Sequence, residues 1–176
     1  MGPPPPPIRL AILVTDQPLP QIAAKLGPFD AIFTTLLRNA CVSLDPPQTL
    51  DSQLALTSHD VVNAAPDAGY PDPGSIDAVL ITGSRAAAYA EDAWVVRLVE
   101  YVRLLLEGGR VRVVGVCFGH QIVARALGAR VAPSPKGWEL SVTEIELSEE
   151  GRRVFGGEKL VGFDPFWACG ELVDEI

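Results

Sequence analysis

The residues best suited to chemistry lie in one short stretch, 111–121, where a cysteine stands between two glycines. The first half of this stretch is apolar and β-branched, which predicts a short buried strand. It continues into Gly115-Val116-Cys117-Phe118-Gly119, and 121–127 then carries the apolar stripe of a helix. This pattern predicts a nucleophile elbow, in which the flanking glycines permit a tight strand-to-helix turn. The helix N-terminus favours a thiolate, and its unpaired amides can stabilise an oxyanion.

A free cysteine is more often a small buried hydrophobic residue than a nucleophile, so Cys117 has a structural alternative. The elbow context favours the nucleophile. The chain has three cysteines, which are widely spaced: Cys41, Cys117 and Cys169. Their odd number and spacing indicate a reducing compartment, and predict neither a disulfide framework nor a metal site.

One segment of the chain reads Gly115-Val116-Cys117-Phe118-Gly119-His120-Gln121. It resembles the nucleophile motif of the class I glutamine amidotransferases. The likeness extends to Ile81-Thr82-Gly83-Ser84 and Lys136-Gly137-Trp138-Glu139, and it covers 8–160. More narrowly, the chain resembles the stand-alone branch similar to the glutaminase domain of GMP synthase. The resemblance implies that glutamine is hydrolysed through a thioester, without a cofactor, and that the ammonia goes to a biosynthetic synthetase or ligase.

The resemblance also implies which groups stabilise the tetrahedral intermediate. In the family, a backbone N–H that follows the third strand joins the amide that follows the cysteine in an oxyanion hole. The matching positions here are Phe118 and either Gly83 or Ser84, of which we favour Ser84; an ordinary turn is the alternative at Gly83-Ser84. Gln121 would hydrogen-bond the substrate, and its alternative is an ordinary helix-surface residue.

Two parts of the chemistry, a general acid for the leaving ammonia and a base for water, have no clear candidate. The family supplies them from a histidine, oriented by a carboxylate, downstream of the Trp-Glu segment. This chain has no histidine after His120. His120 is predicted to pack in the first turn of its helix, and His59 to be solvated or capped and not catalytic.

Composition restricts the class of protein and of partner. The chain has 176 residues, 48% hydrophobic and 20% charged, which predicts one globular domain with a core. Its net charge of −8 argues against nucleic acid as a partner, because phosphate binding needs a basic face. Neither a membrane span nor a signal peptide is visible. We therefore expect a cytoplasmic protein that has no membrane partner.

Apolar patterning predicts an alternation of strands and helices. Strands are predicted at 8–14, 54–64, 76–82 and 111–116, and helices at 21–40, 92–107 and 121–127. The first helix is interrupted at Gly27-Pro28, and its predicted buried face comprises Phe29, Ile32, Phe33, Leu36 and Leu37. The segment 44–57 is rich in turn residues. A further strand at 138–147 is predicted to be antiparallel, and Ser148 to cap a helix.

This order predicts an α/β, flavodoxin-like three-layer fold with a mainly parallel central sheet. Cys117 then lies at the carboxyl end of a central strand, where open α/β sheets bind ligands. We expect three parts: a disordered proline-rich tail at 1–7, an amidotransferase-like domain at 8–160 that is incomplete at its C-terminal side, and an atypical tail at 161–176. Two explanations fit the atypical segment 161–176: the sequence is truncated or misread at its C-terminus, or the protein is a natural pseudoenzyme.

Three functions therefore remain open. The first is a glutamine amidotransferase-like enzyme, which releases ammonia for a synthetase or cleaves a γ-glutamyl peptide bond. The second is a catalytically impaired binding or regulatory subunit of the same fold. The third, which we favour least, is a flavodoxin-like binding domain in which the elbow motif is accidental.

Overall fold

The structure is a computed structural model that describes residues 5–65, 68–133 and 142–163. The chain divides into two compact units, Met1–Gly128 and Ala129–Ile176, which are considered separately. Every residue predicted to belong to the active site lies in the first unit. Most of the two predicted tails, 1–4 and 164–176, lies outside the described residues.

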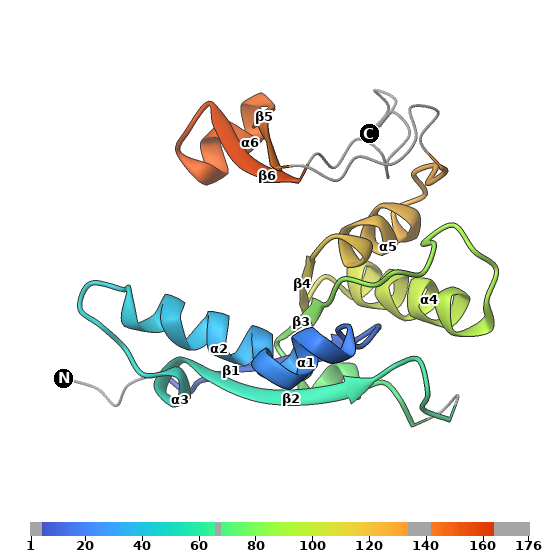
Figure 1. Ribbon diagram of the computed structural model, residues 1–176, viewed down its shortest axis with the longest axis horizontal. Coiled ribbons are helices and arrows are strands. Elements are labelled where there is room, and N and C mark those ends of the chain that lie inside the picture. Colours follow the sequence, from blue (N-terminus) through green and yellow to red (C-terminus); the bar gives the residue numbers. More distant parts are fainter. Residues whose placement is uncertain (1–4, 66–67, 134–141, 164–176) are drawn as a thin grey trace. The chain divides into compact units, whose positions relative to one another are not determined.

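A parallel sheet of four strands forms the centre of the first unit (Figure 1). The strands are β1 (Ile8–Val14), β2 (Leu54–Asp60), β3 (Ala78–Ile81) and β4 (Arg112–Gly115), in the order β2-β1-β3-β4. In register, Leu13 lies opposite Ile81, and Ile81 lies opposite Gly115. The segments that follow β1, β3 and β4 therefore meet at one edge of the sheet.

Helices connect these strands and follow the last of them. They are α1 (Pro20–Leu26), α2 (Phe29–Val42), α3 (Leu50–Gln53), α4 (Ala93–Gly108) and α5 (Phe118–Ala126), and a 3₁₀ helix, η1 (Pro73–Ser75), precedes β3. The break predicted at Gly27-Pro28 separates α1 from α2 and is thus confirmed. None of the helices in the described ranges is long and apolar enough to cross a membrane.

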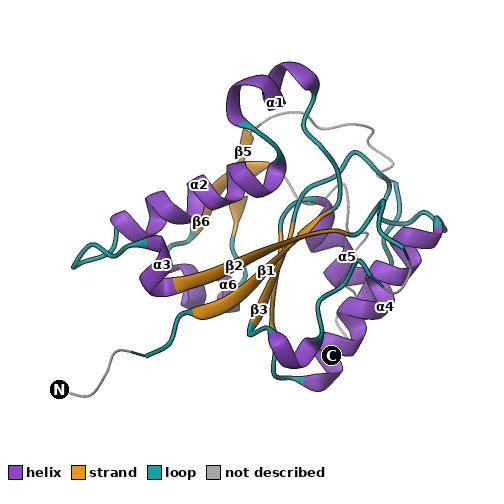
Figure 2. Ribbon diagram, turned by 90° about the horizontal axis from the view of Figure 1, so that it is seen from below, coloured by secondary structure: helices purple, strands orange, loops and turns teal. Residues whose placement is uncertain are grey.

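Helices cover both faces of the sheet, which confirms the predicted three-layer fold (Figure 2). On one face a buried cluster of Leu10, Ile12, Val14 and Leu80 packs against Phe29, Phe33 and Leu37 of α2. Side chains alternate along a strand, so Ile81 points to the face opposite that of Leu80. There α5 approaches β3 so closely that a Cβ added to Gly119 would lie 2.8 Å from the Cβ of Ile81.

The long helix α4 confirms the prediction that a broadly apolar helix at 92–107 packs on the sheet. Its buried residues are Val95, Leu98, Val99, Val102 and Leu105. The helix contacts both β4 and α5. It therefore stands beside the strand and the helix that Cys117 connects.

Several predicted details are wrong for local reasons. The elbow helix begins at Phe118 and not at Gln121, because the turn at Cys117 enters it directly. Leu36 is 56% exposed, since it lies about 100° around α2 from Leu37, whose stripe faces the sheet. Residues 50–53, within the segment expected to be turns, form α3. Among the described strands β4 lies at the edge of the sheet, so Cys117 does not follow a central strand.

The second unit contains β5 (Val142–Glu146), α6 (Glu149–Phe155) and β6 (Lys159–Phe163). The two strands pair antiparallel, as predicted for 138–147, of which 138–141 lie outside the described residues. Ser148 caps α6 as predicted, because its Oγ accepts a hydrogen bond of 3.2 Å from the Gly151 N–H. The boundary expected between 160 and 161 falls inside β6.

The closeness of α5 to the sheet gives a first prediction, which concerns Gly115→Ala and Gly119→Ala. A Cβ at Gly115 would lie 2.4 Å from the carbonyl carbon of Gly119, and one at Gly119 would lie 2.5 Å from the carbonyl oxygen of Ile81. Backbone atoms cannot rotate away as a side chain can. We expect each variant to lower the free energy of unfolding, measured by urea denaturation, by about 1–3 kcal/mol.

Gly108→Ala is the matched control, since a Cβ added at this helical glycine has no atom within 4 Å apart from its chain neighbours and the backbone of its own helix. Alanine is the better helix former, so we expect this variant to be as stable as the parent or slightly more stable. Equal unfolding midpoints for the variants at 108, 115 and 119 would contradict the close approach of α5.

Candidate active site

Cys117 lies at the turn between β4 and α5, where it is the N-cap residue with φ 53° and ψ −110°. It is the one non-glycine residue with a positive φ in the part of the chain that the structure describes. Such a conformation is unfavourable by about 1–3 kcal/mol and persists only where the surroundings impose it. The Cys117 side chain is exposed, whereas that of Cys41 is buried. Cys117 is thus not the buried hydrophobic residue of the structural alternative.

The strained turn is held by close packing and by backbone hydrogen bonds. The Gly119 N–H donates to the Val116 carbonyl at 2.9 Å, and the His120 N–H donates to the Cys117 carbonyl at 3.0 Å. Phe118 is 1% exposed, and its ring lies 5.6 Å from that of Trp94 at the start of α4. Together these contacts fix the first turn of α5 against the sheet and present Cys117 at its end.

The loop after β3 borders Cys117, as the prediction of an oxyanion hole requires. A Cβ added to Gly83 would lie 3.6 Å from the Cβ of Cys117. Ser84 follows in the same loop, and Phe118 is the first residue of α5, so its amide has no acceptor within the helix. The structure therefore brings Cys117, Gly83, Ser84 and Phe118 together, although their roles as nucleophile and donors stay predictions.

Gln121 is 9% exposed on the buried side of α5, which excludes the alternative that it is an ordinary helix-surface residue. Its backbone N–H donates to the Cys117 carbonyl at 3.3 Å. Gln121 is thus fixed one helical turn beyond the nucleophile. A contact between its side chain and a substrate stays a prediction.

The two histidines differ in how close they lie to Cys117. His59 is on β2, which is three strand spacings from β4, about 14 Å. It is half-buried and hydrogen-bonded to Thr57, so it is not simply solvated, and burial lowers its pKa below the ordinary value. The Nδ1 atom of His120 lies 3.3 Å from the Cys117 carbonyl oxygen, consistent with the predicted packing in the first turn.

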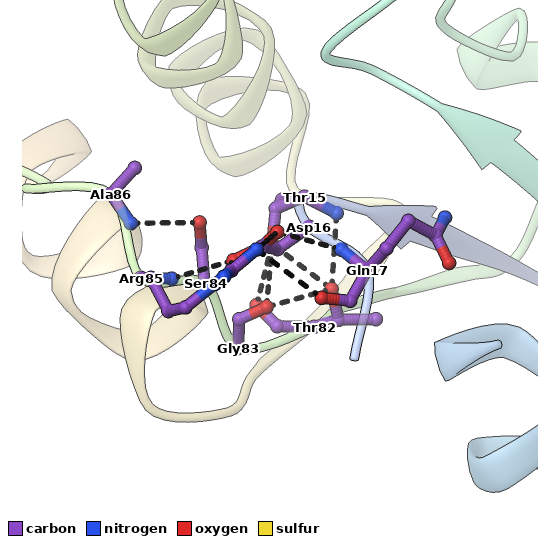
Figure 3. Close-up of polar contacts among 8 residues, drawn as sticks. All are labelled: Thr15, Asp16, Gln17, Thr82, Gly83, Ser84, Arg85 and Ala86. Atoms are coloured by element: carbon purple, nitrogen blue, oxygen red, sulfur yellow. Dashed lines mark hydrogen bonds and ion pairs between the residues drawn. The ribbon is translucent and has the colours of Figure 1, made fainter. Parts of the chain in front are cut away.

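Sequence reasoning missed a polar group at the end of β1, shown in Figure 3. The Asp16 carboxylate accepts hydrogen bonds from the Arg85 backbone N–H at 2.9 Å and from its guanidinium at 2.8 Å. The guanidinium is the main cause that lowers the pKa of Asp16 to about 2. The sequence contained a signal for this pair, because polar residues follow both β1 and β3. Neighbouring parallel strands have their carboxyl ends at the same edge of the sheet.

Thr15 and Thr82 form a second link between the ends of β1 and β3 (Figure 3). Both are buried, at 2% and 0% exposure, and their hydroxyl oxygens lie 2.9 Å apart. The Thr15 N–H donates to the Thr82 hydroxyl at 3.0 Å. The Thr15 hydroxyl reaches the Gly83 carbonyl at 3.0 Å, and that of Thr82 reaches it at 3.2 Å. The backbone beside Ser84 is thus tied to β1.

A cavity of about 420 Å³ opens beside this loop at the carboxyl edge of the sheet. Its lining includes Thr15, Asp16, Asn63, Ser84, Arg85 and Trp94. The cavity thus adjoins the predicted oxyanion donor Ser84 and is walled by the tryptophan that packs on Phe118. Cys117 is not among the residues that line it.

Comparison with known proteins agrees with this geometry. A glutamine amidotransferase-like protein of Schizosaccharomyces pombe is 34% identical over 152 residues, which are 84% of this chain and 59% of that protein. Over 84% of its length the chain is similar to proteins that are named glutamine amidotransferase-like. Gamma-glutamyl peptidase 3 of Arabidopsis thaliana is 29% identical over 93 residues, 51% of this chain and 37% of that protein. No family model matches the chain.

Solved structures confirm the fold of this glutamine amidotransferase-like chain. A glutamine amidotransferase from Thermotoga maritima has a TM-score of 0.61 at 17% identity, over 89% of this chain and 59% of that one. A GMP synthase subunit from Thermoplasma acidophilum has a TM-score of 0.51 at 17% identity, over 90% and 65%. The chain spans less than two thirds of the length of each of these proteins.

The Asp16–Arg85 pair predicts how stability depends on pH. Because the pKa of Asp16 is lowered to about 2 in the folded protein, its contribution is complete above the unfolded pKa of about 3.9. The contribution is lost as the pH falls from about 4 through 2. We expect Asp16→Asn to be about 1–2 kcal/mol less stable than the parent at pH 7, a figure reduced for the exposure of Arg85.

Urea denaturation at pH 7, 5, 4 and 3 checks this expectation, with Glu100→Gln on the exposed side of α4 as the control. The gap between parent and Asp16→Asn should narrow below pH 4, while the control stays close to the parent throughout. A gap that keeps the same size at every pH would show that the charge of Asp16 does not stabilise the fold.

Proposed function

We propose that the chain carries the nucleophile and oxyanion-stabilising part of a glutaminase-type site, as in a glutamine amidotransferase. The observation that supports this most is the exposed Cys117, held at φ 53° on a helix N-terminus with Gly83 beside it. A cysteine that served only packing would not need a strained backbone. The substrate proposed first is glutamine.

In the proposed reaction the Cys117 thiolate attacks the side-chain amide carbon of glutamine. The new S–C bond forms as the C=O electron pair moves to oxygen, and the Ser84 and Phe118 N–H groups donate to that oxyanion. Collapse of this intermediate breaks the C–N bond, so ammonia leaves once its nitrogen is protonated. Water then hydrolyses the γ-glutamyl thioester to glutamate and regenerates the thiol.

Proton transfer to the leaving nitrogen has one histidine close to Cys117 in the part of the chain that the structure describes, His120 on α5. His59 lies on a distant strand, and the Nδ1 atom of His120 faces the carbonyl of Cys117. Without an acid, the intermediate expels the thiolate, which is the weaker base, and glutamine is restored. The second candidate function is that a catalytically impaired chain of the same fold binds glutamine or regulates a partner, and it applies if His120 does not act as the acid.

The substrate class has a specific alternative. The relative named gamma-glutamyl peptidase indicates that the same attack could act on a γ-glutamyl peptide, whose leaving group is an amino acid amine. With glutamine as the substrate, the ammonia would pass to a synthetase or ligase. We also propose that the protein is located in the cytoplasm.

We expect Cys117 to react faster than Cys41 and Cys169 with a glutamine-mimicking chloroketone at pH 7. Cys41 is 6% exposed, whereas Cys117 is exposed at a helix N-terminus. Peptide mass spectrometry after short exposure identifies the labelled site, and Cys117→Ser should lose the label. Preferential labelling of either other cysteine in folded protein would refute the assignment of the nucleophile.

A second test separates acylation from turnover in residues 1–176. With a γ-glutamyl ester of an activated phenol, whose leaving group needs no proton, we expect one equivalent of phenol and a lasting thioester on Cys117. Ammonia release from glutamine should be about 10²–10⁴-fold slower than in a version whose C-terminal segment carries a histidine as in the family.

The control for this test is His120→Ala in the parent chain. Fast ammonia release by the parent, abolished in His120→Ala, would show that His120 is the acid and base after all. Failure to form any thioester would remove the nucleophile assignment itself and leave the binding function.

A further inference from the structure

We propose that Thr15 and Asp16 at the end of β1, here called the β1 clamp, position the Ser84 N–H as an oxyanion donor toward Cys117. This inference rests on the proposed function and adds positioning residues to it. The clamp residues touch no reacting atom. They act on the two peptide groups that flank Ser84.

The first contact fixes the peptide group that precedes Ser84. The Gly83 carbonyl oxygen lies 3.0 Å from the Thr15 hydroxyl and 3.2 Å from the hydroxyl of Thr82. The Thr15 hydroxyl also lies 3.1 Å from the Thr82 carbonyl, so its one proton is shared between two neighbouring carbonyls of the same loop. Both threonines are buried, so water does not compete for these bonds. In a trans peptide the C=O and the following N–H point in opposite directions. The Ser84 N–H is therefore turned away from the threonines, in the loop that borders Cys117.

The second contact fixes the peptide group that follows Ser84. The Arg85 N–H donates to Asp16 at 2.9 Å, and the Arg85 guanidinium holds the same carboxylate through Nε and Nη2, at 2.8 Å each. Charge-assisted, bidentate bonds of this kind are strong and directional. With one bond before Ser84 and one after it, the backbone of this residue has little freedom to rotate.

The orientation matters because an oxyanion hole is effective only when it is preorganised. Removing one donor typically slows acyl transfer by about 10²–10³-fold. A donor that is present but free to rotate loses part of that benefit. The predicted consequence of breaking the β1 clamp is slower attack on a carbonyl, with the intrinsic reactivity of the Cys117 thiol unchanged.

The chain contains a matched control for the aspartate. At the other end of the sheet, Asp77 accepts from the Arg9 backbone N–H at 2.9 Å and from its guanidinium at 3.0 and 2.6 Å. This pair has the same bonding pattern as Asp16–Arg85, but it joins the starts of β1 and β3. Asp77 also lies 3.5 Å from the Arg110 guanidinium. Asp77→Asn should therefore cost at least as much stability as Asp16→Asn, without the same effect on chemistry.

The experiment compares two reactions of Cys117 in the whole chain. Acylation by the activated γ-glutamyl ester passes through an oxyanion, whereas alkylation by iodoacetamide is displacement at a saturated carbon and forms none. The variants are Thr15→Val, Thr15→Ser, Asp16→Asn and the control Asp77→Asn. For Thr15→Val and Asp16→Asn we expect the acylation rate constant to fall about 10-fold or more and the alkylation rate constant to stay within about 2-fold.

Thr15→Ser keeps the hydroxyl and should acylate at close to the parent rate, as should Asp77→Asn. If Thr15→Val and Asp16→Asn acylate like the parent, or if acylation and alkylation fall together, the clamp does not position the donor and the proposal is overturned. A parent chain that alkylates but acylates no faster than a free thiol would instead refute the proposed function. The ratio of the two rate constants distinguishes these failures from a loss of folded protein.

Discussion

The close approach of α5 to β3 and β4 is the constraint on which the candidate site depends. The backbone of Gly119 lies against Ile81 on one strand, and the backbone of Gly115 on the next lies against the first turn of the helix. Neither position has space for a Cβ. This contact leaves the chain between them no room for a relaxed turn, so Cys117 takes φ 53° and its side chain emerges at the sheet edge. The strain and the exposure of the cysteine have the same origin.

The parallel register turns that local contact into a site. Since β1, β3 and β4 end at the same edge of the sheet, the loops that follow these three strands begin close together. Cys117 follows β4, Gly83 and Ser84 follow β3, and the β1 clamp follows β1. Each strand thus contributes a different kind of group to the proposed site: the proposed nucleophile, the proposed backbone donor, and the side chains that hold that donor. The buried Phe118 and its neighbour Trp94 then secure the helix end that supplies the second amide.

Much of this arrangement could be predicted because its causes are local. The apolar run before Cys117 and the spacing of Gly115 and Gly119 are sufficient to predict the strand, the turn and the helix. The break at Gly27-Pro28 is likewise local. The exposure of Leu36 depends on which stripe of α2 meets the sheet, and the edge position of β4 depends on strand order, so neither follows from periodicity. Asp16 and Arg85 lie far apart in the sequence, and their pairing appears only once β1 and β3 are neighbours.

The distribution of these groups separates two parts of amide hydrolysis that are usually discussed together. Attack and charge stabilisation need a nucleophile and amides, and the residues proposed for both lie in the first unit. Proton transfer needs a titratable side chain within hydrogen-bond reach of the leaving nitrogen, and strand order places His59 at the opposite edge of the sheet. For the proposed nucleophile the leaving group then decides how much the acid matters. A carbonyl with a weakly basic leaving group needs no acid to acylate Cys117, whereas an amide does.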